Sequence, residues 1–166
     1  MAVADFVIRN AQLIDGTGAP GVAADIAITD ERITAIGPTL NISAEEDVDA
    51  RGLALAPGFI DAHTHDDRVV LSDPGMACKI SQGVTTVVTG NCGISIAPVR
   101  FTGHPPAPID LIGHAPENFF ATFSDYFAAL DAAPPAVNVV AQVGHTSLRA
   151  MAMDRFDRPA TQLEID

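Results

Sequence analysis

Three apolar runs rich in β-branched residues dominate the second part of the chain, and each run ends in polar residues. They are residues 53–60, 83–89 and 137–143. Strands that are apolar on both faces are typical of a buried parallel sheet. Helix-like stretches at residues 74–81 and 117–130 separate the runs, and a third is expected to begin near Thr146, whose hydroxyl could cap it. This β–α–β–α–β–α order predicts an α/β fold with a parallel sheet.

The first 52 residues show a different pattern of short strands and tight turns. The strand-like segments are residues 6–8, 11–14, 25–28 and 33–36. Turn formers such as Asp15-Gly16-Thr17-Gly18 and Gly37-Pro38 separate them. We therefore predict a small antiparallel sheet, which needs a partner to cover its apolar face.

Charge and composition exclude several classes of protein. The chain has 9 basic and 21 acidic residues, a formal net charge of −12, which argues against a nucleic-acid partner because phosphates attract basic patches. No apolar run reaches the roughly 20 residues of a membrane span, so no membrane partner is expected. Asp5 and Arg9 interrupt the first apolar stretch, which is therefore not a signal peptide. With 2 cysteines, a reducing cytoplasm is the expected compartment.

Two histidines follow the first apolar run. His63 and His65 are separated by one residue, and in an extended segment side chains two apart point to the same side. Both imidazoles can then reach one ion, and imidazole suits Zn²⁺ or a similar divalent metal. Asp61, two residues earlier, is expected on the same side, where it could orient a ligating histidine. The alternative interpretation is ordinary loop polarity.

A cysteine follows the second run, and a histidine follows the third. Cys92 lies between Asn91 and Gly93, at the rim of the predicted sheet, where a thiolate would add a soft ligand and a negative charge. A lone cysteine in an apolar context is otherwise most often a small core residue, which is the interpretation for Cys78. Asn91 and His145 are expected to support the ligands or contact substrate, although His145 could instead cap the next helix.

A proline-rich segment follows the second run. Residues 98–116 contain five prolines, too many for a helix, and are predicted to form a long loop at the end of that strand. Its two histidines, His104 and His114, are expected to be solvated.

Two sequence motifs point to known families. Residues 57–65, PGFIDAHTH, resemble the first-strand motif of the amidohydrolase superfamily. Residues 81–95 and 144–149 resemble the N-acyl-D-amino-acid deacylases, or D-aminoacylases. The resemblance implies a (β/α)₈ TIM barrel preceded by a small antiparallel β-sandwich module. Residues 1–52 would form the N-terminal part of the module and residues 53–166 the first three or so βα units.

The barrel is expected to be incomplete in this chain, because a whole one needs roughly 250 residues. We therefore expect the chain to be the N-terminal part of a longer enzyme and to be inactive by itself. The resemblance implies zinc-dependent hydrolysis of an N-acyl-D-amino acid to a carboxylate and a free D-amino acid, with one or two zinc ions per site. It assigns His63, His65 and Cys92 as ligands and places the aspartate that transfers the proton downstream of this chain.

In this branch the cysteine replaces the carboxylated lysine of many relatives. The only lysine here, Lys79, lies in the first helix-like stretch, in the wrong place for that role. Two alternatives stay open: a cyclic-amide hydrolase of the hydantoinase or dihydroorotase type, and a non-catalytic scaffold. A partial barrel also leaves the edge of its last strand unpaired, so we expect copies of this chain by itself to associate with one another.

Overall fold

The computed structural model describes residues 3–165, so residues 1, 2 and 166 of the predicted ranges lie outside the described residues. The chain forms two compact units, Met1–Pro57 and Gly58–Asp166. The division falls after Pro57, later than the predicted position after Gly52. The reason is that Ala54–Leu55, expected at the start of the first barrel strand, pairs with a strand of the first unit.

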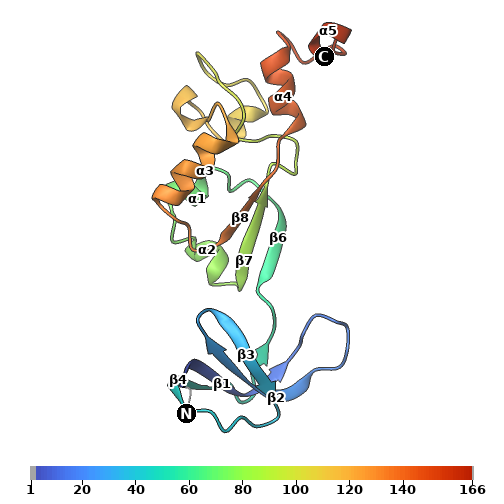
Figure 1. Cartoon of the computed structure of the whole chain (residues 1–166). Helices are drawn as coiled ribbons and strands as arrows, with labels where there is room; N and C mark the ends of the chain where they lie inside the picture. Colours follow the sequence, from blue (N-terminus) through green and yellow to red (C-terminus); the bar gives the residue numbers. More distant parts are fainter. Residues whose placement is uncertain (1–2, 166) are drawn as a thin grey trace. The chain divides into compact units, whose positions relative to one another are not determined.

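The first unit is a five-stranded sheet (Figure 1). Its strands are β1 (Ala4–Leu13), β2 (Val22–Thr29), β3 (Arg32–Gly37), β4 (Ala44–Asp49) and β5 (Ala54–Leu55). The order is β3-β2-β1-β4, and β5 also pairs with β1. β1, β2 and β3 are antiparallel neighbours, as predicted, but β4 and β5 run parallel to β1. The purely antiparallel prediction is wrong because the chain after β3 crosses to the far edge of β1 before it pairs again.

Strand β1 also replaces two predicted strands. Residues 6–8 and 11–14 were expected to be separate, but β1 is continuous and has a register shift between Ile8 and Ala11. Asn10 lies at this shift with a positive φ of 59°, and its backbone N–H donates to Asp25 at 2.9 Å. The guanidinium of Arg9 donates to Asp47 at 2.8 Å and to the carbonyl of Leu40 at 2.8 Å. These bonds hold the segment after β3 against β1.

The first unit leaves part of its apolar surface open. A cavity of about 300 Å³ is lined mainly by isoleucine and leucine side chains, including Ile8, Ile26 and Leu55. Ile33 and Ile36, at its margin, are exposed. This surface agrees with the expectation that the sheet needs a partner for its apolar face.

The second unit contains three parallel strands in the order β6-β7-β8. These strands are β6 (Phe59–Thr64), β7 (Val84–Thr89) and β8 (Asn138–Ala141). Helices α1 (Val69–Ser72) and α2 (Ala77–Ile80) connect β6 to β7, and α3 (Phe123–Ala132) precedes β8. Figure 1 shows these three helices on the same face of the sheet. The predicted α/β order with parallel strands is confirmed.

The helices differ from the prediction at their ends. The stretch 74–81 holds only the single turn α2, preceded by Met76 with a left-handed φ of 46°. The stretch 117–130 becomes helical only at Phe123, after Thr122 accepts a hydrogen bond from the N–H of Asp125 at 3.1 Å. Before it, residues 116–118 form a 3₁₀ turn, and Phe120 pairs through its backbone with Ile96.

Helix α4 (His145–Ala152) follows β8 and begins one residue earlier than predicted. Gly144 is its N-cap and no side chain caps it, so the capping role predicted for Thr146 is wrong. The backbone N–H of Thr146 instead donates to the carbonyl of Gly93 at 2.7 Å. This bond attaches the start of α4 to the loop after β7.

The core of the second unit lies between the sheet and its helices. Its largest buried side chain is Tyr126 of α3, whose hydroxyl donates to the carbonyl of Asp67 at 2.9 Å. Residues 98–116 form the predicted loop with one short 3₁₀ turn, Ile109–Leu111, and Ile109 is buried in the same core. His104 and His114 in this loop are exposed.

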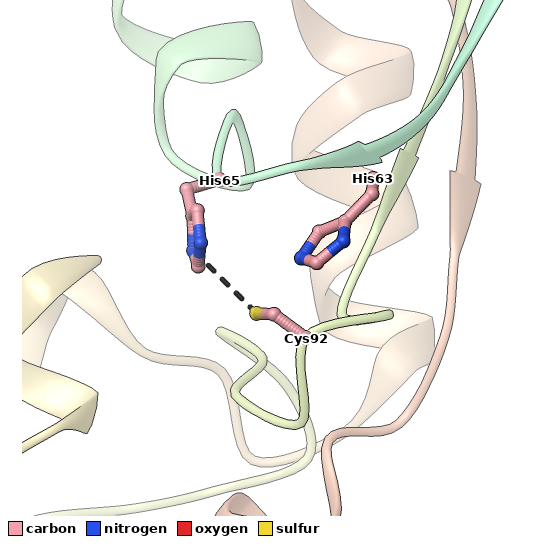
Figure 2. A group of neighbouring side chains, drawn as sticks. All are labelled: His63, His65 and Cys92. Atoms are coloured by element: carbon pink, nitrogen blue, oxygen red, sulfur yellow. Dashed lines mark hydrogen bonds between the residues drawn. The ribbon is translucent and has the colours of Figure 1, made fainter.

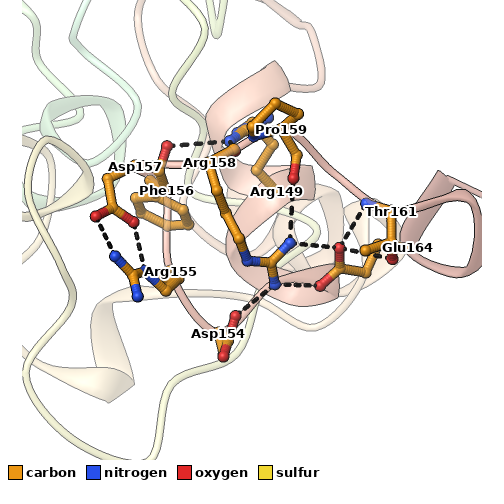
Figure 3. Close-up of polar contacts among 9 residues, drawn as sticks. All are labelled: Arg149, Asp154, Arg155, Phe156, Asp157, Arg158, Pro159, Thr161 and Glu164. Carbon is orange, nitrogen blue, oxygen red and sulfur yellow. Dashed lines mark hydrogen bonds and ion pairs between the residues drawn. The ribbon is translucent and has the colours of Figure 1, made fainter.

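The last described residues are held by two arginines (Figure 3). Arg149 donates to the carbonyls of Phe156 at 3.1 Å and Arg158 at 2.9 Å. Arg158 pairs with Glu164 at 2.6 Å, at the short helix α5 (Gln162–Ile165), and with Asp154 at 2.5 Å. Between residues 3 and 165, none of the helices has the length and apolar character needed to cross a membrane.

Candidate metal centre

Three side chains from two strand ends converge beyond the sheet of the second unit (Figure 2). His63 and His65 come from the end of β6 and the residue after it, and Cys92 comes from the loop after β7. One ligand atom from each residue lies within 4.8 Å of the other two. The Sγ of Cys92 lies 3.5 Å from Nδ1 of His65. The predicted juxtaposition of two imidazoles and one thiol is therefore present in the structure.

The loop that carries Cys92 depends on glycine at its first position. Gly90 has a φ of 80°, and a Cβ built there would lie 2.0 Å from the carbonyl oxygen of Gln142. This close approach brings the loop against the end of β8. Gly93, with a φ of 99°, then turns the chain back after Cys92. The glycines therefore determine where the sulfur lies.

Asn91 links this loop to the histidine strand. Its side-chain amide donates to the carbonyl of Ala62 at 2.8 Å. Ala62 directly precedes His63, so this bond joins the two segments that carry the three candidate ligands. Asn91 thus supports the cluster through the backbone of Ala62.

A buried pair of serines fixes the other end of the loop. The N–H of Ser95 donates to Oγ of Ser147 at 2.8 Å, and that hydroxyl donates to the carbonyl of Ser95 at 3.0 Å. The Oγ of Ser95 accepts from the N–H of Gly144 at 2.9 Å. These bonds connect the Cys92 loop to the start of α4. Sequence reasoning missed both serines, because nothing in either local sequence indicates a partner about fifty residues away.

His145 lies apart from the cluster. It is exposed at the start of α4 and lines a cavity of about 440 Å³ together with Leu148, Arg149 and Met153. Within residues 3–165, the side chains that lie close enough together to hold one ion are those of His63, His65 and Cys92, and His145 is not among them. The structure therefore does not bring His145 to the candidate ligands.

Asp61 lies beside the cluster, and its hydrogen bonds among the described residues join it to Lys79 and to the backbone of His63, not to an imidazole ring. Its Oδ2 accepts from Nζ of Lys79 at 2.6 Å, and its Oδ1 accepts from the backbone N–H of His63 at 3.4 Å. The pairing of β6 with β7 shifts register between Asp61 and Thr64, which interrupts the regular alternation of side chains. The hydrogen bond from Lys79 holds the pKa of the Asp61 carboxyl below its usual range.

Two further acidic residues follow His65, and sequence reasoning assigned no role to either. Asp66 pairs with Nζ of Lys79 at 2.9 Å and accepts from the hydroxyl of Thr64 at 2.6 Å. Asp67 is 1% exposed, and burial raises its pKa to about 6. Its Oδ2 has no hydrogen-bond partner among the described residues. Consecutive acidic residues directly after the histidines are the signal that could have drawn attention to them.

The exposed thiol of Cys78 corrects another expectation. Cys78 was interpreted as a structural, core-type residue, but both cysteines are free and exposed in this chain. Cys78 lies in the single turn α2, and its backbone carbonyl accepts from the side-chain amide of Gln82 at 2.8 Å. It therefore has no part in the cluster around Cys92.

Comparison with known proteins relates this site to a family. A model of the amidohydrolase family matches residues 46–164. An N-acyl-D-aspartate deacylase of Alcaligenes xylosoxydans xylosoxydans is 54% identical over 164 residues, 98% of this chain and 32% of the relative. A D-aminoacylase of the same organism is 50% identical over 161 residues, 97% of this chain and 33% of the relative. The chain thus spans about a third of the length of these relatives.

Solved structures agree with these matches. A crystal structure of D-aminoacylase superposes with a TM-score of 0.91 at 51% identity, over 98% of this chain and 34% of that one. An N-acyl-D-glutamate deacylase from Bordetella bronchiseptica, in complex with zinc and a phosphonate inhibitor, gives a TM-score of 0.89 at 46% identity, again over 98% and 34%. The predicted resemblance to N-acyl-D-amino-acid deacylases is confirmed.

Proposed function

Since the chain belongs to the amidohydrolase family, we propose that it is the N-terminal part of a zinc-dependent hydrolase acting on N-acyl-D-amino acids. The products are a carboxylate and a free D-amino acid. The observation that carries this proposal is the convergence of His63, His65 and Cys92, whose ligand atoms lie within 4.8 Å of one another. The substrate class is that of the relatives, which act on N-acyl derivatives of D-amino acids by name.

The donor set of the cluster fits zinc. Zinc in proteins takes imidazole nitrogen and thiolate sulfur, and a set of two neutral imidazoles and one thiolate offsets part of its charge. His63, His65 and Cys92 would hold the ion from one side, and the remaining ligands would come from outside this chain. The similar Bordetella bronchiseptica deacylase contains zinc, and one D-aminoacylase has a binuclear metal centre. Bound zinc supplies a Lewis acid for the hydrolysis of an amide.

The supporting residues of this chain would orient the ligands. Asn91 joins the Cys92 loop to the backbone before His63, and the Ser95–Ser147 pair fixes the same loop to α4. Asp61 holds the backbone at His63. The carboxylate that transfers the proton would lie outside these residues, so the chain by itself should hydrolyse negligible amounts of substrate.

The architecture of the whole protein forms part of this proposal. The parallel strands β6, β7 and β8 would be the first strands of a (β/α)₈ barrel, with the cluster at their carboxyl ends, where barrel enzymes place their active sites. The sheet β1–β5 would be the N-terminal part of a β-sandwich. A reducing cytoplasm would be the compartment, because oxidation of the exposed Cys92 thiol would remove a ligand.

The two free cysteines allow a matched test of this function in the full-length protein. Cys92→Ala removes a ligand, so we expect bound zinc to fall to less than half of the wild-type content and kcat/KM for N-acyl-D-amino acids to fall by roughly 100-fold or more. Zinc is measured by elemental analysis, and hydrolysis by release of the D-amino acid. Cys78→Ala, which removes the other exposed thiol, should keep wild-type zinc and activity.

Three results would contradict the proposal. A Cys92→Ala protein with unchanged zinc content would remove the cysteine from the metal site. Hydrolysis of hydantoins or dihydroorotate in preference to linear N-acyl-D-amino acids would replace the substrate class. A well-folded wild-type protein without bound metal would indicate a scaffold.

A further inference from the structure

The ammonium group of Lys79 forms ion pairs with one residue before the two histidines and with one residue after them. Lys79 is the only lysine in the chain, and its Nζ lies 2.6 Å from Oδ2 of Asp61 and 2.9 Å from Oδ2 of Asp66. Asp61 precedes His63, and Asp66 follows His65. The Nζ also donates to the hydroxyl of Thr64, between the two histidines, at 3.2 Å. One side chain from α2 therefore closes a loop of backbone that contains both imidazoles.

These contacts are partly withdrawn from water. The side chains of Lys79, Asp61 and Asp66 are 19%, 29% and 15% exposed. An ion pair on an open surface contributes little, but one ammonium shared by two carboxylates at such low exposure holds its partners in a narrower set of positions. Asp66 also accepts from Thr64 at 2.6 Å, so the four groups form one connected network.

The backbone in this region needs such a support. The regular pairing between β6 and β7 is interrupted between Asp61 and Thr64, so ladder hydrogen bonds do not by themselves fix the residues that carry the imidazoles. Asn91 reaches this segment at Ala62, before both histidines. Lys79 contacts the segment on both sides of the histidines, at Asp61 and at Asp66.

We infer that Lys79 is a positioning residue, which holds the segment from Asp61 to Asp66 so that His63 and His65 face Cys92 before a metal ion binds. This inference rests on the proposed function. It assigns Lys79 a role different from that of a metal ligand, because its Nζ is engaged by three oxygens, those of Asp61, Thr64 and Asp66. Preorganised ligands bind a metal more tightly, since less conformational freedom is lost on binding.

The test compares variants of two cationic side chains in the full-length protein, Lys79 and Arg158, each of which pairs with two carboxylates. Lys79→Met keeps the apolar stem and removes the charge, and Lys79→Arg keeps a cation. Arg158→Met is the matched control, because Arg158 also joins two carboxylates, Asp154 and Glu164, and within residues 3–165 it contacts no residue of the candidate metal centre. Zinc dissociation constants are measured by competition with a chelator. The absorption spectrum of the cobalt-substituted protein reports the ligand geometry.

We expect Lys79→Met to weaken zinc binding by roughly 10- to 100-fold and to change the cobalt spectrum, as is typical when a group that orients a ligand is removed. Lys79→Arg should recover most of the affinity, and Arg158→Met should keep both the wild-type affinity and the spectrum. If Lys79→Met does not fold, Asp66→Asn serves instead and should also weaken zinc binding, because it removes one of the two charged partners of Lys79.

The inference and the proposed function fail in different ways. A wild-type protein that binds no zinc contradicts the proposed function and, with it, this inference. A wild-type protein that binds zinc, together with a folded Lys79→Met or Asp66→Asn variant of unchanged affinity and spectrum, overturns the role of Lys79 alone. Equal losses of affinity in Lys79→Met and Arg158→Met would also overturn it, because they would reflect general stability.

Discussion

Gly90 shows how one residue without a side chain can determine a site. The loop after β7 passes so close to β8 that any Cβ at Gly90 would overlap the carbonyl oxygen of Gln142, and the φ of 80° adds strain for other residues. We therefore expect Gly90→Ala to destabilise the full-length protein by roughly 3 kcal/mol and to displace Cys92. Thermal unfolding and zinc content are the measurements.

Gly103→Ala is the matched control for this prediction. A Cβ at Gly103 meets nothing within 4 Å, and its φ lies outside the positive range. This variant should stay within about 0.5 kcal/mol of the wild type. Equal stability of the two alanine variants would show that the loop relaxes and that its path does not depend on Gly90.

At the residue scale, the positions of some functional side chains could be predicted from the sequence and those of others could not. His63, His65 and Cys92 are polar residues at the ends of apolar runs, so the parallel order of the strands predicts that they meet at one edge of the sheet, and the family resemblance assigns them as ligands. Lys79, Ser95 and Ser147 act through partners distant in the sequence, and those contacts depend on the tertiary structure. Asp61 was misplaced because a local shift in strand pairing breaks the two-residue alternation.

At the scale of elements, long apolar runs were more informative than short ones. The strands β7 and β8 lie within their predicted runs, which are rich in β-branched residues, whereas β6 overlaps its predicted run only at Phe59 and Ile60. The parallel direction of β4 and β5 was not predictable, because short strands do not show which edge of the sheet the chain reaches next. Phe119 and Phe120 have the spacing of the helix α3, but backbone bonds from Phe120 to Ile96 and from Val99 to Phe120 keep that segment extended.

The C-terminal segment gives a pH-dependent prediction at this scale. Hydrogen bonds from Arg158 lower the pKa of Glu164 to about 2 from its ordinary value of 4.5. A carboxyl whose pKa is lowered in the folded state stabilises it fully above its unfolded pKa, and this contribution is lost as the pH falls toward 2. The contacts between Arg158 and Glu164 in Figure 3 should therefore persist at pH 3.5.

Carboxyl NMR of the full-length protein labelled with ¹³C-glutamate measures this titration directly. The signal of Glu164, assigned by its absence in Glu164→Gln, should titrate well below the usual glutamate range. In Arg158→Met, its midpoint should return toward the ordinary value, because the hydrogen bonds are gone. A midpoint near 4.5 in the wild type would mean that the pair does not persist in solution.

At the scale of the whole molecule, each unit leaves apolar surface uncovered when the chain is alone. Within the described residues, β8 forms one edge of the three-stranded sheet, and Val140 and Val143 beside this edge are exposed. In the first unit, Ile33 and Ile36 are exposed at the apolar cavity. Unpaired strand edges and open apolar surface both favour association with other chains.

We therefore expect residues 1–166, expressed by themselves, to associate in a concentration-dependent manner, measured by light scattering. A charged residue on an edge strand opposes edge pairing, so Val140→Lys should reduce association if β8 is the contact. Ile33→Lys should reduce it if the first sheet is the contact, so the two variants distinguish the surfaces. A chain that stays monomeric at millimolar concentration would show that side chains of the two units already protect these surfaces, and the argument from uncovered edges would then fail.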